Sequence, residues 1–292
     1  MKVQGRDCTI VIKTTHKEDN QRLLDVPYSE ETIREAVSIL QEEAAIEGDG
    51  NCKAIIKKNG VTGCVVTPLT IDTVPLLLYL AFGSAGKPIY VSQTRNVYNS
   101  KLNLLPLEDN ECFDLIQDRK NERRVFEDCR IQGFDFRIEN DSAIKLKLDV
   151  CGERNAKTYL YADDVERTTG ERFKSNHVDY YINEKINNFI YGITLSVKKT
   201  GGVKTEIWIK RILPVGNELP ECIEELNIRA RLLSSKYECN CYGLFSITLK
   251  NLVLISDETN INSSDTVIDP LRYYVSGSVS ATVHTVSDKE LT

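Results

Sequence analysis

The sequence predicts a mainly β protein with a small number of helices, and three observations support this fold class. From Glu127 onward, apolar and polar residues alternate in successive runs, the period of two expected of strands with one buried face. The longest apolar run, Val74 to Gly83, contains a proline and is half the length of about 20 residues that a membrane span needs. With 41% hydrophobic and 27% charged residues, the 292-residue chain can build a sizeable core.

The apolar run predicts a short buried helix over residues 72–83. Asp72 is a suitable N-cap, and Pro75 falls in the first turn, where its missing N–H costs little. Gly83 or Gly86 can supply the left-handed residue that ends the helix. The "GSAGKP" sequence that follows lacks the spacing of a phosphate-binding loop. The candidate packing or interface residues of this helix are Leu76, Leu77, Leu80 and Phe82.

Two further elements are expected before this helix. Residues 29–46 predict a second helix, because Ser29 can cap it and apolar residues recur at helical spacing. Residues 52–66 predict a hairpin with Asn59-Gly60 as its turn. With the strands that continue to residue 152, these elements make up an N-terminal half over residues 1–155.

The second half of the chain is predicted to be β-rich over residues 177–286, either as a separate unit or as part of the same domain. A polar stretch at 156–176 reads as a linker or long loop, and residues 287–292 as a tail. Two hairpins of similar pattern, turning at Asn140-Asp141 and at Gly201-Gly202, weakly suggest a duplication. Weak helical spacing recurs at 220–233.

The sequence does not predict an enzyme, and it indicates no catalytic, cofactor-binding or metal-binding residues. Its three histidines lie outside any known catalytic or metal motif, and its nine cysteines include no CxxC pair. The first 20 residues lack the apolar core of a secretion signal, so we expect free thiols in a reducing compartment. The net charge of −6 argues weakly against a surface that grips nucleic acid.

One part of the chain resembles a known family. The segment "GVTGCVVTPLTIDTVPLLLYLAFGSAGKP" and the later "FEDCRIQGFDFRIENDSAIKLKLDVCGE" resemble the tail tube (major tail) proteins of long-tailed bacteriophages. In that family a strand leads into an apolar helix ending in "AFGS", and an alternating hairpin follows. The resemblance extends from Gly63 to Gly152 and is looser from Phe189 to Val283.

This resemblance implies two packed antiparallel sheets, in a sandwich or barrel-like arrangement with flanking helices. It also implies self-assembly into rings, expected to be hexameric, that stack into a hollow tube for DNA delivery. The partners would be ring neighbours, tape measure and tail-end proteins, and DNA passing without specific binding, with a sheath protein in contractile tails and no membrane insertion. The location would be the virion tail, after synthesis in the host cytoplasm.

Two alternatives remain open: the inner-tube subunit of a contractile injection device or tailocin, and a β-sandwich ligand-binding module such as a carbohydrate-binding protein. If the protein forms a tube, DNA should slide through its lumen, so the lumen wall should not present many cationic side chains that bind phosphates. The polar face of the 127–152 hairpin therefore gives candidate lumen-facing residues: Asp135, Glu139 and Asp149.

Overall fold

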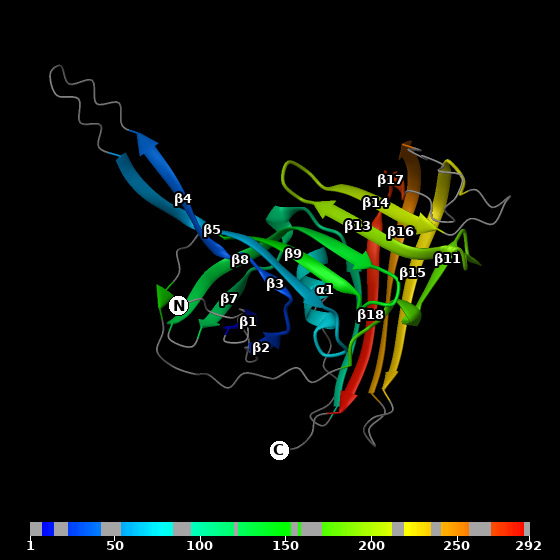
Figure 1. Cartoon of the computed structure of the whole chain (residues 1–292), viewed down its shortest axis with the longest axis horizontal. Coiled ribbons are helices and arrows are strands. Elements are labelled where there is room, and N and C mark those ends of the chain that lie inside the picture. The colour runs from blue at the N-terminus through cyan, green and yellow to red at the C-terminus, as the bar shows by residue number, and fades with distance from the viewer. Residues whose placement is uncertain are drawn as a thin grey trace.

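The protein is mainly β, with a large antiparallel sheet and one α-helix among the residues that the structure describes (Figure 1). The computed structural model describes residues 8–14, 23–41, 54–83, 95–119, 122–152, 157–158, 171–211, 219–234, 241–256 and 270–288. The helical elements are α1 (Val74–Phe82) and the short 3₁₀ turns η2 (Leu107–Asp109) and η3 (Ser175–His177). The strands before α1 are β1 (Cys8–Thr14), β2 (Leu23–Val26), β3 (Glu30–Glu31), β4 (Arg34–Gln41) and β5 (Ala54–Pro68). Those from α1 to residue 158 are β6 (Arg95–Asn103), β7 (Phe113–Arg119), β8 (Glu122–Ile138), β9 (Lys145–Gly152) and β10 (Lys157–Thr158). The remaining strands are β11 (Val178–Ile182), β12 (Lys185–Ile186), β13 (Ile190–Lys198), β14 (Lys204–Arg211), β15 (Cys222–Ser234), β16 (Cys241–Ser256), β17 (Leu271–Val275) and β18 (Val279–Asp288).

The helix predicted over residues 29–46 is wrong for its described part, up to residue 41, which forms β3 and β4. Both strands pair with β5, and the Ser29 side chain donates to the Val66 carbonyl (3.3 Å) instead of capping a helix. The sequence carries two opposing signals here: the apolar residues recur at helical spacing, but the β-branched Val37 and Ile39 favour a strand when a partner strand is present. The pairing with β5 decided the outcome.

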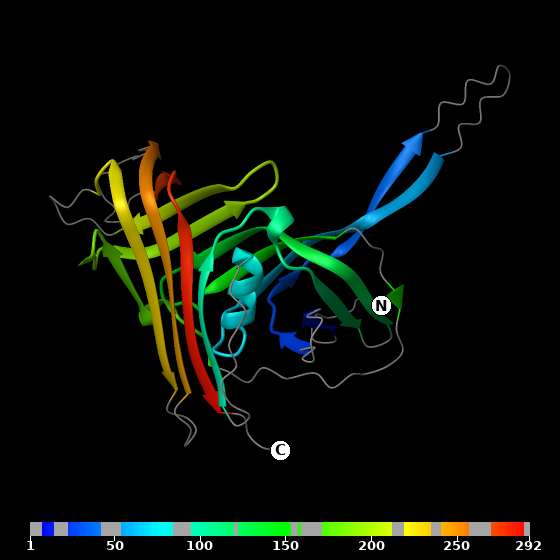
Figure 2. The ribbon, with the colours of Figure 1, turned by 180° about the vertical axis from the view of Figure 1, so that it is seen from behind.

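The predicted hairpin at residues 52–66 is also wrong, because β5 runs straight through Asn59-Gly60. Opposite this dipeptide, the register of β4 shifts between Glu35 and Val37, and Gly60 takes a φ of 75°. Asn59-Gly60 is therefore a β-bulge, in which glycine accommodates the left-handed residue. The bulge lies at the point where β4 and the first half of β5 leave the rest of the sheet as a projecting two-stranded arm (Figures 1 and 2).

The predicted short apolar helix is confirmed as α1. Gly83 ends it in the left-handed conformation (φ 76°), and the Gly83 N–H donates to the Tyr79 carbonyl (2.8 Å). The N-cap is Thr73 and not Asp72; the Thr73 hydroxyl is engaged with Thr70 (2.9 Å). Almost every side chain of the helix is buried within the chain, so the fold itself covers α1.

The long strand β8 is a branch point of the sheet. One edge of β8 pairs first with β7 and then with β13, and the other edge pairs with β9 and β10. The predicted β8–β9 hairpin is confirmed: Phe134 lies opposite Leu148 and Phe136 opposite Leu146, all buried. The second predicted hairpin, β13–β14 with its Gly201-Gly202 tip, lies directly beside the first through the β8–β13 pairing.

The second branch point is β16, which pairs with β15 along one edge and with β18 and then β17 along the other. The weak helical spacing at 220–233 was misleading, because this segment is the 13-residue strand β15. Its buried residues Leu226, Ile228 and Ala230 alternate as a strand requires, and pairing with both β11 and β16 satisfies its backbone.

Both halves of the chain contribute to one hydrophobic core. The Phe136 ring on β8 contacts the Phe245 ring on β16 (centroids 5.8 Å apart), and the Phe82 ring of α1 contacts Phe134 (5.4 Å). Phe173 is fully buried against Phe245, and its backbone bonds to both Leu69 and Ile144. The end of the predicted 156–176 linker is therefore part of the core; residues 153–156 and 159–170 lie outside the described chain. The predicted 287–292 tail begins inside β18, and its last four residues are likewise outside.

Candidate functional site

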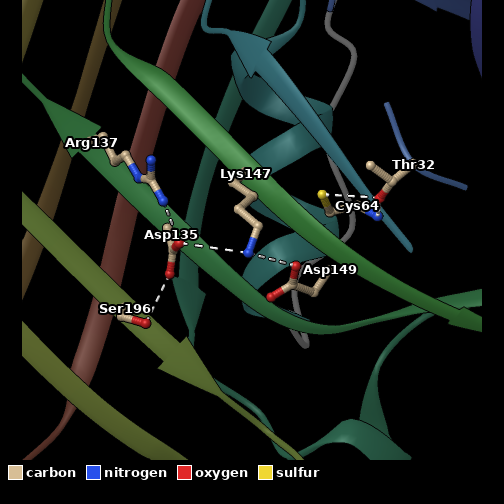
Figure 3. A network of polar contacts seen from close by, with 7 residues as sticks. All are labelled: Thr32, Cys64, Asp135, Arg137, Lys147, Asp149 and Ser196. Atoms are coloured by element: carbon tan, nitrogen blue, oxygen red, sulfur yellow. Dashed lines mark hydrogen bonds and ion pairs between the residues drawn. The ribbon is translucent and has the colours of Figure 1, made fainter. Parts of the chain in front are cut away.

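The polar face of the β8–β9 hairpin carries two of the three candidate lumen residues in a compact network (Figure 3). Asp135 accepts hydrogen bonds from Arg137 (2.9 Å) and Ser196 (2.8 Å), and its carboxylate lies 3.8 Å from the Lys147 ammonium. Lys147 pairs more closely with Asp149 (3.0 Å). Desolvation lowers the pKa of Lys147, but the hydrogen bond to Asp149 and the charges of Asp149 and Asp135 together outweigh it, so the net shift of the pKa is upward. The two predicted acids are therefore neutralised locally by two bases.

The third candidate, Glu139, is separate from this network. It lies just beyond the end of β8, is exposed, and its backbone carbonyl accepts a hydrogen bond from the Ser142 hydroxyl (2.9 Å) in the β8–β9 turn. Asp135 and Asp149, by contrast, alternate with the buried residues of their strands and point away from the core as predicted. The structure thus brings together two of the three sequence candidates.

The same polar face is basic once neighbouring strands are included, a property that one hairpin alone did not reveal. Cross-strand partners share a face, so the register of β13, β14 and β17 assigns their charged side chains to this surface. From β9 across the second half of β8 to β17, seven bases oppose three acids: Arg137, Lys145, Lys147, Lys198, Lys204, Lys210 and Arg272 against Asp135, Asp149 and Glu206.

A second unusual group is the buried amine of Lys199, just after β13. Its side chain is 1% exposed, and its Nζ donates to Asn110 Oδ1 (2.9 Å) and to the Phe82 carbonyl at the end of α1 (3.4 Å). Within the described chain no carboxylate pairs with it, and desolvation lowers the pKa of Lys199 to about 7. Lys199 thus ties the β13–β14 tip to α1 and the η2 loop. Sequence reasoning missed it, since a lysine in "VKKTGG" reads as exposed.

The candidate helix residues serve the core of this chain. Leu77, Leu80 and Phe82 are buried and Leu76 is partly buried against the same cluster. Exposed apolar side chains lie elsewhere and include a group on β16 and β17: Val253, Ile255 and Tyr274 are 45%, 46% and 41% exposed, and Val253 lies opposite Tyr274.

One edge of strand β6 has no partner strand among the residues that the structure describes. The Leu104 N–H donates to the Val279 carbonyl (3.1 Å), so it points toward β18. Because N–H groups alternate in direction along a strand, those of Lys101 and Asn103 point away from β18. Neither has an acceptor among the described residues, whereas the next outward N–H, that of Leu105, donates to Phe82 (2.8 Å). The unpaired part of the edge therefore ends where α1 meets it.

None of the five cysteines whose side chains are described is in a disulfide bond: Cys64, Cys112, Cys129, Cys151 and Cys222. Cys64 is within 3.4 Å of the Thr32 hydroxyl at the border of the polar face (Figure 3). Burial raises the pKa of Cys129 to about 12. In the described part of the chain, no three His, Cys, Asp or Glu side chains gather closely enough to hold a metal ion.

No family model matches the chain, and no curated protein matches it significantly. The described helices are too short to cross a membrane.

Proposed function

We propose that this protein is a self-assembling structural subunit of a bacteriophage tail tube. The observation that carries the proposal is the free edge of β6 within a large antiparallel sheet. An unpaired edge favours addition of another strand, and closing a ring of copies satisfies every such edge. The exposed Val253, Ile255 and Tyr274 add an apolar surface of the kind that subunit contacts bury.

In this proposal the sheet is organised as two packed layers. One contains β5, β9, β8, β13 and β14, and the other contains β15, β16, β18 and β6. The Phe136–Phe245 contact across the core and the position of α1 beside β18, β6 and β8 support this arrangement. Rings would stack into a conduit for DNA, in contact with tape measure, tail-end and, in a contractile device, sheath proteins, within the virion tail.

The charges bear on which face would line the conduit. Asp135, Glu139 and Asp149 remain candidates for the lumen, but their face has an excess of bases when β13, β14 and β17 are counted. Lysine and arginine contacts to phosphates release counterions and hold DNA. For DNA to slide past this face, the bases would have to be engaged by neighbouring subunits, or the face would lie outside the conduit.

The decisive experiment compares proline variants on β6 by electron microscopy and size-exclusion chromatography with light scattering. Lys101→Pro removes an outward N–H and leaves the β6–β18 ladder intact, so we expect a folded protein that does not form rings. Lys101→Ala controls for the side chain and should assemble normally. Ser100→Pro removes an N–H on the β18-facing side and should lower thermal stability. Closed rings or tubes formed by Lys101→Pro, or a wild-type protein that stays monomeric at high concentration, would contradict the proposal.

A further inference from the structure

An open hollow of about 250 Å³ lies where three separate segments meet. These segments are the β8–β9 turn, the η3–β11 segment, and the β12–β13 connection with the start of β13. The volume is slightly below the range of about 300–1,000 Å³ typical of small-molecule pockets, so it suits one small ring more than an extended ligand.

The polar groups of the hollow are mostly uncharged amides and hydroxyls. The amides of Asn140, Asn176 and Asn188 line it, and none makes a hydrogen bond within the described chain. Asn187 is different: its Oδ1 accepts from the Phe189 N–H (3.0 Å) and so holds the turn in shape. Each free amide offers both donors and an acceptor, which matches the donor and acceptor character of neighbouring hydroxyl groups on a ligand.

Tyr180 is the most informative residue of this hollow. Its side chain is only 6% exposed and makes no hydrogen bond to the described residues, but its hydroxyl is not among the fully buried unpaired atoms and therefore keeps contact with solvent. Burial also raises its pKa, so the hydroxyl stays protonated and can donate. A ligand seated in the hollow that Tyr180 lines would take this hydrogen bond in place of water.

The remaining lining determines the class of ligand. Val178, Ile190 and the half-buried Tyr191 add apolar surface, and no lysine or arginine side chain lines the hollow, which disfavours an anion. Of its two carboxylates, Asp141 can accept hydrogen bonds, whereas Asp179 already lies 3.9 Å from the Arg231 guanidinium; neither belongs to a group of described residues able to hold a metal. Amides, carboxylates and an aromatic ring together fit a molecule with a hydroxylated rim and apolar C–H faces.

We infer that this hollow binds a neutral sugar residue of a glycan. The inference goes beyond the proposed tube function and does not depend on assembly, because every lining residue belongs to a single chain. The amides and the Tyr180 hydroxyl bond to the sugar hydroxyls, and Tyr191 packs against its C–H face.

The test is saturation-transfer difference NMR with a panel of free sugars: glucose, galactose, mannose, rhamnose, N-acetylglucosamine and N-acetylgalactosamine. One or more should bind at millimolar concentration. Tyr180→Phe should weaken that binding about 5- to 10-fold, the value of one hydrogen bond, with an unchanged melting temperature. Tyr191→Ala should reduce binding further, and Asn103→Ala, an exposed asparagine on β6, should bind as the wild type does.

Three results would overturn the inference. One is the absence of transfer from every sugar of the panel. Another is equal binding by the wild type and by both tyrosine variants. The third is a heat of binding when calcium chloride alone is titrated into the wild-type protein, if Asp179→Asn abolishes that heat. Such a result would identify a cation site in place of a sugar site.

Discussion

Replacing Lys199 with methionine should make the protein more stable at neutral pH and remove a specific pH dependence. The Lys199 amine titrates with a pKa of about 7 in the folded chain and near 10.5 when unfolded. Between these values the unfolded chain holds one more proton than the folded chain, so stability rises with pH by about 1.4 kcal/mol per pH unit. Over the whole window the gain in the free energy of unfolding is at most about 5 kcal/mol.

Methionine has a similar unbranched shape and carries no charge, so it avoids the cost of deprotonating or burying an ammonium group. It also loses the hydrogen bond to Asn110, worth about 1 kcal/mol. We therefore expect Lys199→Met to be several kcal/mol more stable than the wild type at pH 7. The two proteins should become nearly equal, or reverse in order, near pH 10.

The assay is urea unfolding of both proteins at intervals from pH 6 to pH 10, with the free energy of unfolding compared at each pH. Taking the difference between them cancels the other titrating groups. Lys198→Met is the matched control, because it makes the same substitution at the neighbouring lysine, whose side chain is exposed. A difference between wild type and Lys199→Met that stays constant across this range would refute the reasoning.

Three further outcomes are expected. Leu77→Asp should abolish folded protein, because an unpaired charge in the core costs on the order of several kcal/mol; a wild-type melting curve would contradict the buried position of α1. Gly83→Ala should lower the melting temperature more than Gly201→Ala. Both glycines have positive φ (76° and 71°), but a Cβ at Gly83 collides with a buried amide while one at Gly201 meets nothing within 4 Å. Cys222 should react with a thiol reagent in the native protein, whereas Cys129, buried and with its pKa raised to about 12, should react only after unfolding.

The sequence by itself determined the elements whose signal is local. The alternation of Phe134 and Phe136 with charged residues, matched by Leu146 and Leu148, specified both strands of the β8–β9 hairpin and its register. A slip of one strand by one residue would have turned its two apolar side chains to the polar face. The apolar run ending at Gly83 likewise specified α1, because few residues other than glycine accept its left-handed conformation.

Tertiary structure decided the elements whose local signals were ambiguous. Residues 34–41 and 222–234 carry helical spacing, but each became a strand because a long neighbouring strand could satisfy its backbone. Asn59-Gly60 has the sequence of a turn and became a bulge because the strand continued on both sides.

The site features depended even more on partners distant in sequence. Most of the basic excess on the polar face comes from β13, β14 and β17, which align beside β8. The burial of Lys199 requires Asn110 and Phe82, 89 and 117 residues away along the chain. The open hydroxyl of Tyr180 likewise depends on three segments meeting around it. Local pattern determines how a strand alternates; which groups it meets depends on the strands that pair with it.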